Sequence, residues 1–199
     1  MKVLLIGAAG TLGSSVREVL GERGHEVVTA SRTDSALRVD ITDPDSIGAM
    51  YDQVGTVDAV ASAAGEVPWL PLDQFEHSDV RNGLIGKAAS QVELVRQGLH
   101  RVADNGSFTL ITGILAREPI RTGAVASMAN GAVESFVRAA AIELPRGLRI
   151  NAVSPTVFVE SMEDYSDLFA GFEPVPVRLA ANAYVRSVEG RQTGQVYRV

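Results

Sequence analysis

The 199-residue sequence contains no cysteine, which excludes disulfide bridges and thiolate chemistry and suits a reducing compartment. It has no block of lysine or arginine, and its formal net charge of -6 disfavours a nucleic acid as partner. The N-terminal apolar run Val3–Ile6 ends at Gly7, whereas a secretory signal needs roughly 7–15 apolar residues and a membrane helix about 20. We therefore expect a soluble, cytoplasmic protein with no membrane partner.

Two further kinds of site are missing from the sequence. The three histidines, His25, His77 and His100, are not spaced with carboxylates as metal ligands are, so no metal site is expected. The sequence also lacks the Gly-Lys-Ser/Thr pattern of a nucleoside triphosphate loop. A metal-dependent or triphosphate-dependent activity is therefore not predicted.

The composition, 46% hydrophobic and 21% charged, is that of a globular chain, and the length fits one domain spanning residues 1–199. Apolar strand-like runs alternate with amphipathic helical stretches, which predicts an α/β Rossmann-type fold, a doubly wound parallel sheet between two layers of helices. The expected strands are Val3–Ile6, Glu26–Ala30, Leu37–Asp40, Val57–Ala63, Ser107–Thr112, Arg149–Ser154 and Gln195–Val199. The expected helices include 12–23, 80–103, 123–143 and 177–188, with a short lid region at about 156–176.

Three glycines, Gly7, Gly10 and Gly13, follow the first strand at a spacing of three and lead directly into a helix. Gly7 permits a tight turn, Gly10 lets a pyrophosphate approach the backbone, and Gly13 lets the helix pack closely on the strand. The first helical turn, which includes Thr11 and Leu12, presents free N–H groups to a phosphate. This loop predicts a dinucleotide site.

The end of the second strand, Ser31-Arg32, indicates which dinucleotide binds. An acid there would accept a hydrogen bond from the ribose 2′-hydroxyl of NAD, whereas an arginine can pair with the 2′-phosphate of NADP. Arg32 therefore predicts NADP(H), although Asp34 nearby leaves NAD open.

Together these residues resemble the short-chain dehydrogenase/reductase family along nearly the whole chain. Gly7-x-x-Gly10-x-Leu-Gly13 is similar to its cofactor loop, and the stretches 131–144 and 149–155 are similar to its active-site helix and the strand and turn after it. The resemblance implies that further residues contact the cofactor: Asp40, Ile41, Ala63, Ala64, Gly65 and Pro155. It also implies an oxidoreductase that acts on a small carbonyl or alcohol.

This sequence differs from the family at the catalytic positions. The family places a tyrosine and a lysine one helical turn apart, so that the lysine lowers the pKa of the tyrosine that transfers the proton. In this register the tyrosine position holds Ala126, the lysine position holds Asn130, and the serine position holds Gly113, beside Thr112. The family's asparagine falls near Ile85, with Asn82 one turn earlier. The sequence thus keeps the cofactor loop and lacks the proton-transfer pair.

Thr112, Asn130 and Lys87 are the predicted replacements in a non-standard active site, with the lid-region tyrosines Tyr165 and Tyr184 as other candidate proton sources. Glu118, in the loop after Thr112, could act as an acid or base if partly buried, but a surface ion pair with Arg117 is the favoured interpretation. The alternative function is a non-catalytic NADP(H)-binding sensor or partner protein. The long helices expected at 80–103 and 123–143 carry more apolar positions than one buried stripe needs, which predicts a homodimer or tetramer through them.

Overall fold

The computed structural model describes residues 1–33 and 35–199. Seven parallel strands form one sheet in the order β3-β2-β1-β4-β5-β6-β7, which confirms the predicted Rossmann-type fold. The strands are β1 (Lys2–Ile6), β2 (Glu26–Ser31), β3 (Leu37–Arg38), β4 (Val57–Ser62), β5 (Val102–Ile111), β6 (Arg149–Ser154) and β7 (Val196–Arg198). The strand order reverses between β1 and β4, and open α/β sheets bind ligands at the carboxyl ends of strands beside such a reversal.

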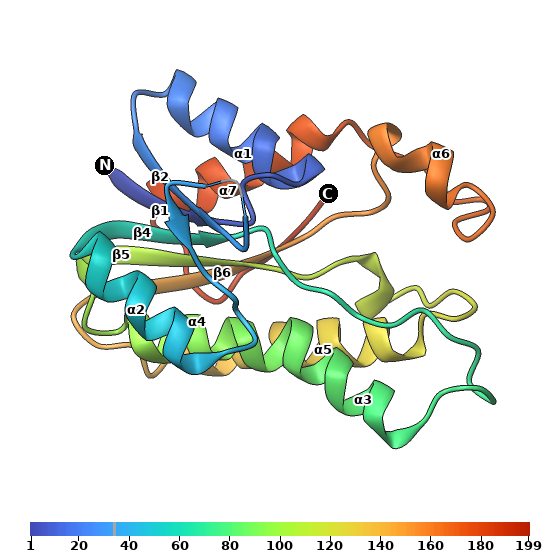
Figure 1. Cartoon of the computed structure of the whole chain (residues 1–199). Coiled ribbons are helices and arrows are strands. Elements are labelled where there is room, and N and C mark those ends of the chain that lie inside the picture. The colour runs from blue at the N-terminus through green and yellow to red at the C-terminus, as the bar shows by residue number, and fades with distance from the viewer. Residues whose placement is uncertain (34) are drawn as a thin grey trace.

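Helices cover both faces of the sheet. Figure 1 shows α1 (Thr11–Glu22) and α7 (Val177–Glu189) on one face, with α2 (Pro44–Val54), α4 (Ser90–Gly98) and α5 (Ala124–Ala140) on the other. Shorter segments connect them: α3 (His77–Gly83), the π-helix η1 (Leu84–Ala89), η2 (Ile114–Ala116), η3 (Val159–Ser161) and α6 (Met162–Tyr165). In the part of the chain that the structure describes, none of the helices has the length and apolar character needed to cross a membrane.

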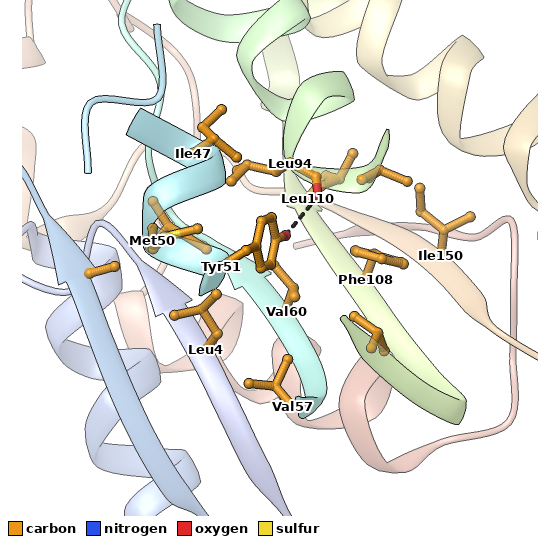
Figure 2. Close-up of a cluster of buried hydrophobic side chains, with 14 of the residues drawn as sticks. Leu4, Ile47, Met50, Tyr51, Val57, Val60, Leu94, Phe108, Leu110 and Ile150 are labelled. Atoms are coloured by element: carbon orange, nitrogen blue, oxygen red, sulfur yellow. Dashed lines mark hydrogen bonds between the residues drawn. The ribbon is translucent and has the colours of Figure 1, made fainter. Parts of the chain in front are cut away.

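The continuous apolar run of β1 is explained by burial on both faces. Leu4 and Ile6 join the cluster beneath α2, α4 and α5, whereas Val3 and Leu5 join the cluster beneath α1 and α7. Figure 2 shows the first cluster, in which the Tyr51 hydroxyl donates a hydrogen bond of 2.7 Å to the carbonyl oxygen of Leu94. This bond links α2 to α4 and satisfies the one polar atom of that buried side chain.

The long helix predicted at 80–103 forms as one continuous helical stretch, in which α3, the π-helix η1 and α4 follow each other without a break, but its predicted end is wrong. The stretch ends at Gly98, where an added Cβ would lie 2.7 Å from the Phe108 ring. Val102, which fits a helical apolar period, already belongs to β5 and pairs with Val57. The pairing of β4 with β5 then shifts register before Ser107, so the strand expected to begin at Ser107 begins earlier.

Candidate functional site

A cavity of about 710 Å³ opens at the carboxyl ends of β1, β2 and β4, where the strand order reverses. It is lined by nine of the residues predicted to contact a cofactor: Gly7, Gly10, Ser31, Arg32, Asp40, Ile41, Ala63, Ala64 and Gly65. The wall opposite the glycine loop is completed by Glu66, Val67, Pro68, Asn82, Ile85 and Gly86. Residues from five separate parts of the sequence thus enclose one ligand-sized space.

Two glycines of the loop, Gly7 and Gly13, are needed by the fold, whereas Gly10 is needed only by the cavity. A Cβ on Gly13 would lie 2.0 Å from the carbonyl oxygen of Gly7, so α1 can pack this closely only on a glycine. A Cβ on Gly10 would meet only that same oxygen, at 3.7 Å. Gly7 adopts a φ of 84° and donates its N–H to Ala30, which fixes the turn.

The next turn of chain, Thr11-Leu12-Gly13, begins α1 and leaves its first N–H groups without intrahelical acceptors. Leu12 is buried on the face of α1 that packs on the sheet. Thr11, Leu12 and Gly13 do not line the cavity itself, and the loop motif assigns the phosphate contact to their backbone N–H groups.

Charged side chains gather at the end of the cavity formed by β2 and β3. The carboxylate of Asp40 accepts hydrogen bonds from the Thr42 hydroxyl at 2.7 Å and from the Thr42 N–H at 2.9 Å, and these bonds lower the pKa of Asp40. Arg32 lies 3.7 Å from Glu66, and their side chains are 73% and 82% exposed. Asp34, the nearby acid that leaves NAD open as the cofactor, lies outside the described residues.

Lys87 packs against the cavity wall at Gly65. A Cβ added to Gly65, whose φ is 154°, would lie 2.5 Å from the Lys87 Cδ. Burial lowers the pKa of the Lys87 ammonium to about 8. Lys87 belongs to η1, which packs on α5, and π-turns of this kind are frequent at functional sites. Asn82 and Ile85, between which the sequence did not decide, both line the cavity, as expected of residues three apart on one helix face.

We predict that Lys87→Met raises the free energy of unfolding at pH 7 by about 1–3 kcal/mol, because the folded chain no longer has to desolvate an ammonium. The pKa of Lys87 is near 8 in the folded chain and 10.5 in the unfolded chain, so the unfolded state binds more protons between these values. The free energy of unfolding of the parent protein therefore rises with pH over that range. The additional stability of the Lys87→Met variant should disappear by about pH 10.5. Urea denaturation of both proteins across pH 7–10.5 measures this, with Lys2→Met as control. A gain that is equal at every pH would contradict the prediction.

Thr112 is turned toward a buried carboxylate on α5. Its hydroxyl is 3.3 Å from the carbonyl oxygen of Val153 and 3.4 Å from Glu134, to which the Ser154 hydroxyl also donates at 3.2 Å. The guanidinium of Arg117 donates to the Ser154 hydroxyl at 2.7 Å and lies 3.8 Å from Glu134. We call Thr112, Arg117, Glu134 and Ser154 the polar cluster.

Sequence reasoning missed Glu134, which is only 6% exposed. From the sequence alone, Glu134 would be interpreted as a solvent-exposed acid. Its position one turn after Asn130 nevertheless places both residues on the same face of α5. The predicted surface pair of Arg117 with Glu118 is wrong, because Arg117 is partly buried against the polar cluster while Glu118 is exposed.

Asn130 and Gly113 are brought together, as the family register predicted. A Cβ on Gly113 would lie 3.4 Å from the Asn130 Nδ2. Asn130 is 6% exposed, and no described group lies within hydrogen-bond reach of its Oδ1. A buried amide oxygen without a partner is uncommon in folded proteins, so this atom is a candidate acceptor for a ligand. Pro155, the remaining predicted cofactor residue, accepts a hydrogen bond from the Ile114 N–H beside this pair.

Apolar side chains occupy the region around Ala126. Ala126 is buried in a cluster with Leu115, Val157 and Phe169, to which the segment between β6 and α7 contributes. Tyr165, on α6, packs its ring against Trp69 and Phe169, each with ring centres 6.3 Å away. We call this group the apolar cluster.

Tyr184 does not reach the site, so its candidacy as a proton source is wrong. It lies on α7 and is fully buried, with its hydroxyl donating a hydrogen bond of 2.7 Å to the carbonyl oxygen of Ser62. Burial raises the pKa of its phenol. Among the residues that the structure describes, no group of three or more histidine or acidic side chains is placed to hold a metal ion.

A family model described as enoyl-(acyl carrier protein) reductase matches residues 9–190. The protein lin1944 of Listeria innocua, known from a crystal structure, is 50% identical, with a TM-score of 0.98 over 100% of this chain and 99% of that one. Human L-xylulose reductase is 28% identical over 181 residues, which cover 81% of this chain and 73% of the relative. A small-chain dehydrogenase crystallised in complex with NADPH is 23% identical, with a TM-score of 0.86 over 100% of this chain and 96% of that one, a likeness of fold.

Proposed function

Because the chain belongs to the short-chain dehydrogenase/reductase family, we propose that it binds NADP(H) in the large cavity and acts as an oxidoreductase on a small carbonyl or alcohol. The observation that carries the proposal is the cavity at the strand reversal, closed on one side by a glycine loop in which only Gly10 leaves room for a ligand. The relatives that are named for an activity are reductases and dehydrogenases, and one solved structure of this fold holds NADPH.

The residues present fit such a cofactor. The glycine loop and the first turn of α1 would hold the pyrophosphate, and Arg32 would hold the 2′-phosphate. Asp40 and Ile41 would line the adenine side, with Ala63, Ala64 and Gly65 toward the nicotinamide. The unpartnered Oδ1 of Asn130 would accept a hydrogen bond from a ribose hydroxyl.

The cofactor, when bound, supplies or accepts the hydride, so the chain must orient the substrate and move one proton. We propose Lys87 as the proton source, since an ammonium with a pKa near 8 can release a proton close to neutral pH. Thr112 would polarise the substrate oxygen by turning its hydroxyl proton away from Glu134. Asn130 would position the cofactor without titrating.

The competing function is a non-catalytic NADP(H)-binding protein. It is favoured by Ala126, which offers no proton at the position where the family has its tyrosine. It is also favoured by the apolar cluster, which occupies the space around that position. Under this function the cavity would be used for binding alone, and the proposed roles of Thr112 and Lys87 in proton transfer would not exist.

One experiment separates the two functions. Purified protein is titrated with NADPH and NADH and then incubated with deuterium-labelled NADPH and a panel of aldehydes and ketones. Transfer of the label to a substrate supports the oxidoreductase. Binding of NADPH without transfer to any carbonyl supports the sensor or partner protein, and binding of neither cofactor would overturn both.

We predict that NADPH binds about ten- to a hundredfold more tightly than NADH, because a charge-assisted contact between Arg32 and the 2′-phosphate stabilises the complex by roughly 1.5–3 kcal/mol. Arg32→Ala should remove this preference and leave NADH binding nearly unchanged. Calorimetric titration of both proteins with both cofactors measures it. Equal affinity of the parent protein for the two cofactors would show that Arg32 does not recognise the 2′-phosphate.

We also propose a homodimer or tetramer in which the α4 and α5 faces of two copies pack together. Ile85, Met128 and Ile142 are large apolar side chains exposed on or beside these helices, and Ile142 is 88% exposed. Burial of such side chains against a second copy would remove them from water. Light scattering at micromolar concentration measures the mass, and a monomer would contradict the proposal.

A further inference from the structure

Arg32 and Glu66 face each other across the mouth of the large cavity. Arg32 follows β2 and Glu66 follows β4, the two strands that lie on either side of β1, and both residues line the cavity. Their charged groups lie 3.7 Å apart. The side chain expected to meet a 2′-phosphate is thus already directed at a carboxylate of the same chain.

The backbone on each side of the mouth is held in place. The Glu66 N–H donates a hydrogen bond of 3.1 Å to the carbonyl oxygen of Gly86, which ties the β4 side to η1. On the other side, the Ser31 hydroxyl oxygen accepts hydrogen bonds from the Thr33 N–H at 3.3 Å and from the Ser35 hydroxyl at 2.8 Å. The two long side chains can therefore exchange partners while these backbone segments stay in place.

The ion pair is of the kind that a stronger anion displaces. Both side chains are largely in water, where such pairs contribute little to stability. A phosphate monoester carries up to two negative charges and three acceptor oxygens, so it competes well with one carboxylate for a guanidinium. The displaced carboxylate of Glu66 would then remain close to the bound phosphate and repel it.

We propose that Glu66 is a specificity-determining residue that competes with the 2′-phosphate of NADP(H) for Arg32. This inference rests on the proposed binding of NADP(H) in the large cavity. Glu66 weakens NADPH binding because the ion pair must break, and it leaves NADH binding almost unaffected because the pair can stay. The chain's preference between the two cofactors is set by this competition and not by Arg32 alone.

Glu66→Gln, which keeps the size and polarity of the side chain and removes its charge, tests the proposal. The variant should bind NADPH about three- to tenfold more tightly than the parent, and NADH within about twofold. Calorimetric titration with each cofactor measures both affinities and needs no substrate. Glu173→Gln is the matched control, because Glu173 is exposed and lines a different cavity. It should change neither affinity.

A double-mutant cycle shows whether Glu66 acts through Arg32. In the Arg32→Ala background, Glu66→Gln should gain markedly less NADPH affinity than it does in the parent. An equal gain in both backgrounds would overturn the proposal, because Glu66 would then act only by general repulsion. Unchanged NADPH affinity of Glu66→Gln would also overturn it and leave the proposed function standing. Failure of the parent to bind NADPH would overturn both.

Discussion

Gly10→Val is expected to weaken NADPH binding by about a hundredfold while the protein stays folded. The backbone of Gly10 is extended, with φ −78° and ψ 168°, a conformation that valine adopts readily. A Cβ there would meet only the Gly7 carbonyl oxygen, at 3.7 Å. The Cβ is therefore accommodated by the fold, and because Gly10 lines the cavity we expect the added side chain to occupy space that the pyrophosphate would need.

Binding and stability must be measured together on this variant. Calorimetry gives the affinity, and urea denaturation should show a free energy of unfolding within about 1 kcal/mol of the parent. Gly21→Val, near the end of α1, is the control, because a Cβ at Gly21 meets nothing within 4 Å and Gly21 does not line the cavity. An affinity of Gly10→Val equal to that of the parent would remove the central support for the proposed function.

Gly13→Ala is expected to lower the free energy of unfolding by about 3 kcal/mol or more. Its Cβ would lie 2.0 Å from the carbonyl oxygen of Gly7 and 2.8 Å from the Cα of Ala8, and neither is a flexible side chain that can move aside. The first turn of α1 must therefore separate from the loop after β1. This separation loosens the packing of Leu12 and Val16 on the sheet.

Urea denaturation of the Gly13→Ala protein measures this loss. The control is Gly21→Ala, which should be neutral or stabilising by up to about 1 kcal/mol, since alanine favours the helix and meets no neighbour. A denaturation midpoint equal to that of the parent would show that the loop relaxes without cost. The two glycines would then not have the separate roles that the geometry gives them.

The fold and the large cavity could be predicted because local patterns determine them. The buried run of β1, the glycine loop and the residues after β2 and β4 are each contiguous in sequence, and parallel strands bring their carboxyl ends to one edge. Gly7, Arg32 and Gly65 therefore line the same cavity, as expected. The end of the long helix was placed too late because Leu99 and Val102 fit a helical period, whereas the end of α4 depends on the close approach of Gly98 to Phe108.

Side-chain partners across the sheet could not be predicted in the same way. Glu134 is buried because Thr112, Ser154 and Arg117 converge on it from the ends of β5 and β6, and nothing in its own helix signals this. Glu66 meets Arg32 only because β4 lies next to β1 and β1 next to β2. Tyr184 was misplaced for the related reason that α7 packs on the opposite face from α5.

The large cavity and the polar cluster are built from separate stretches of the chain. The residues that line the cavity all fall between Ile6 and Gly86, whereas the polar cluster begins at Thr112 and ends at Ser154. A substitution at Ala126 or Asn130 therefore changes the second stretch without altering a residue of the cavity wall. The wall of the large cavity and the polar cluster can thus change independently in this architecture, and Lys87 and Asn130 are the residues through which the proposed cofactor site and the proposed proton-transfer site remain linked.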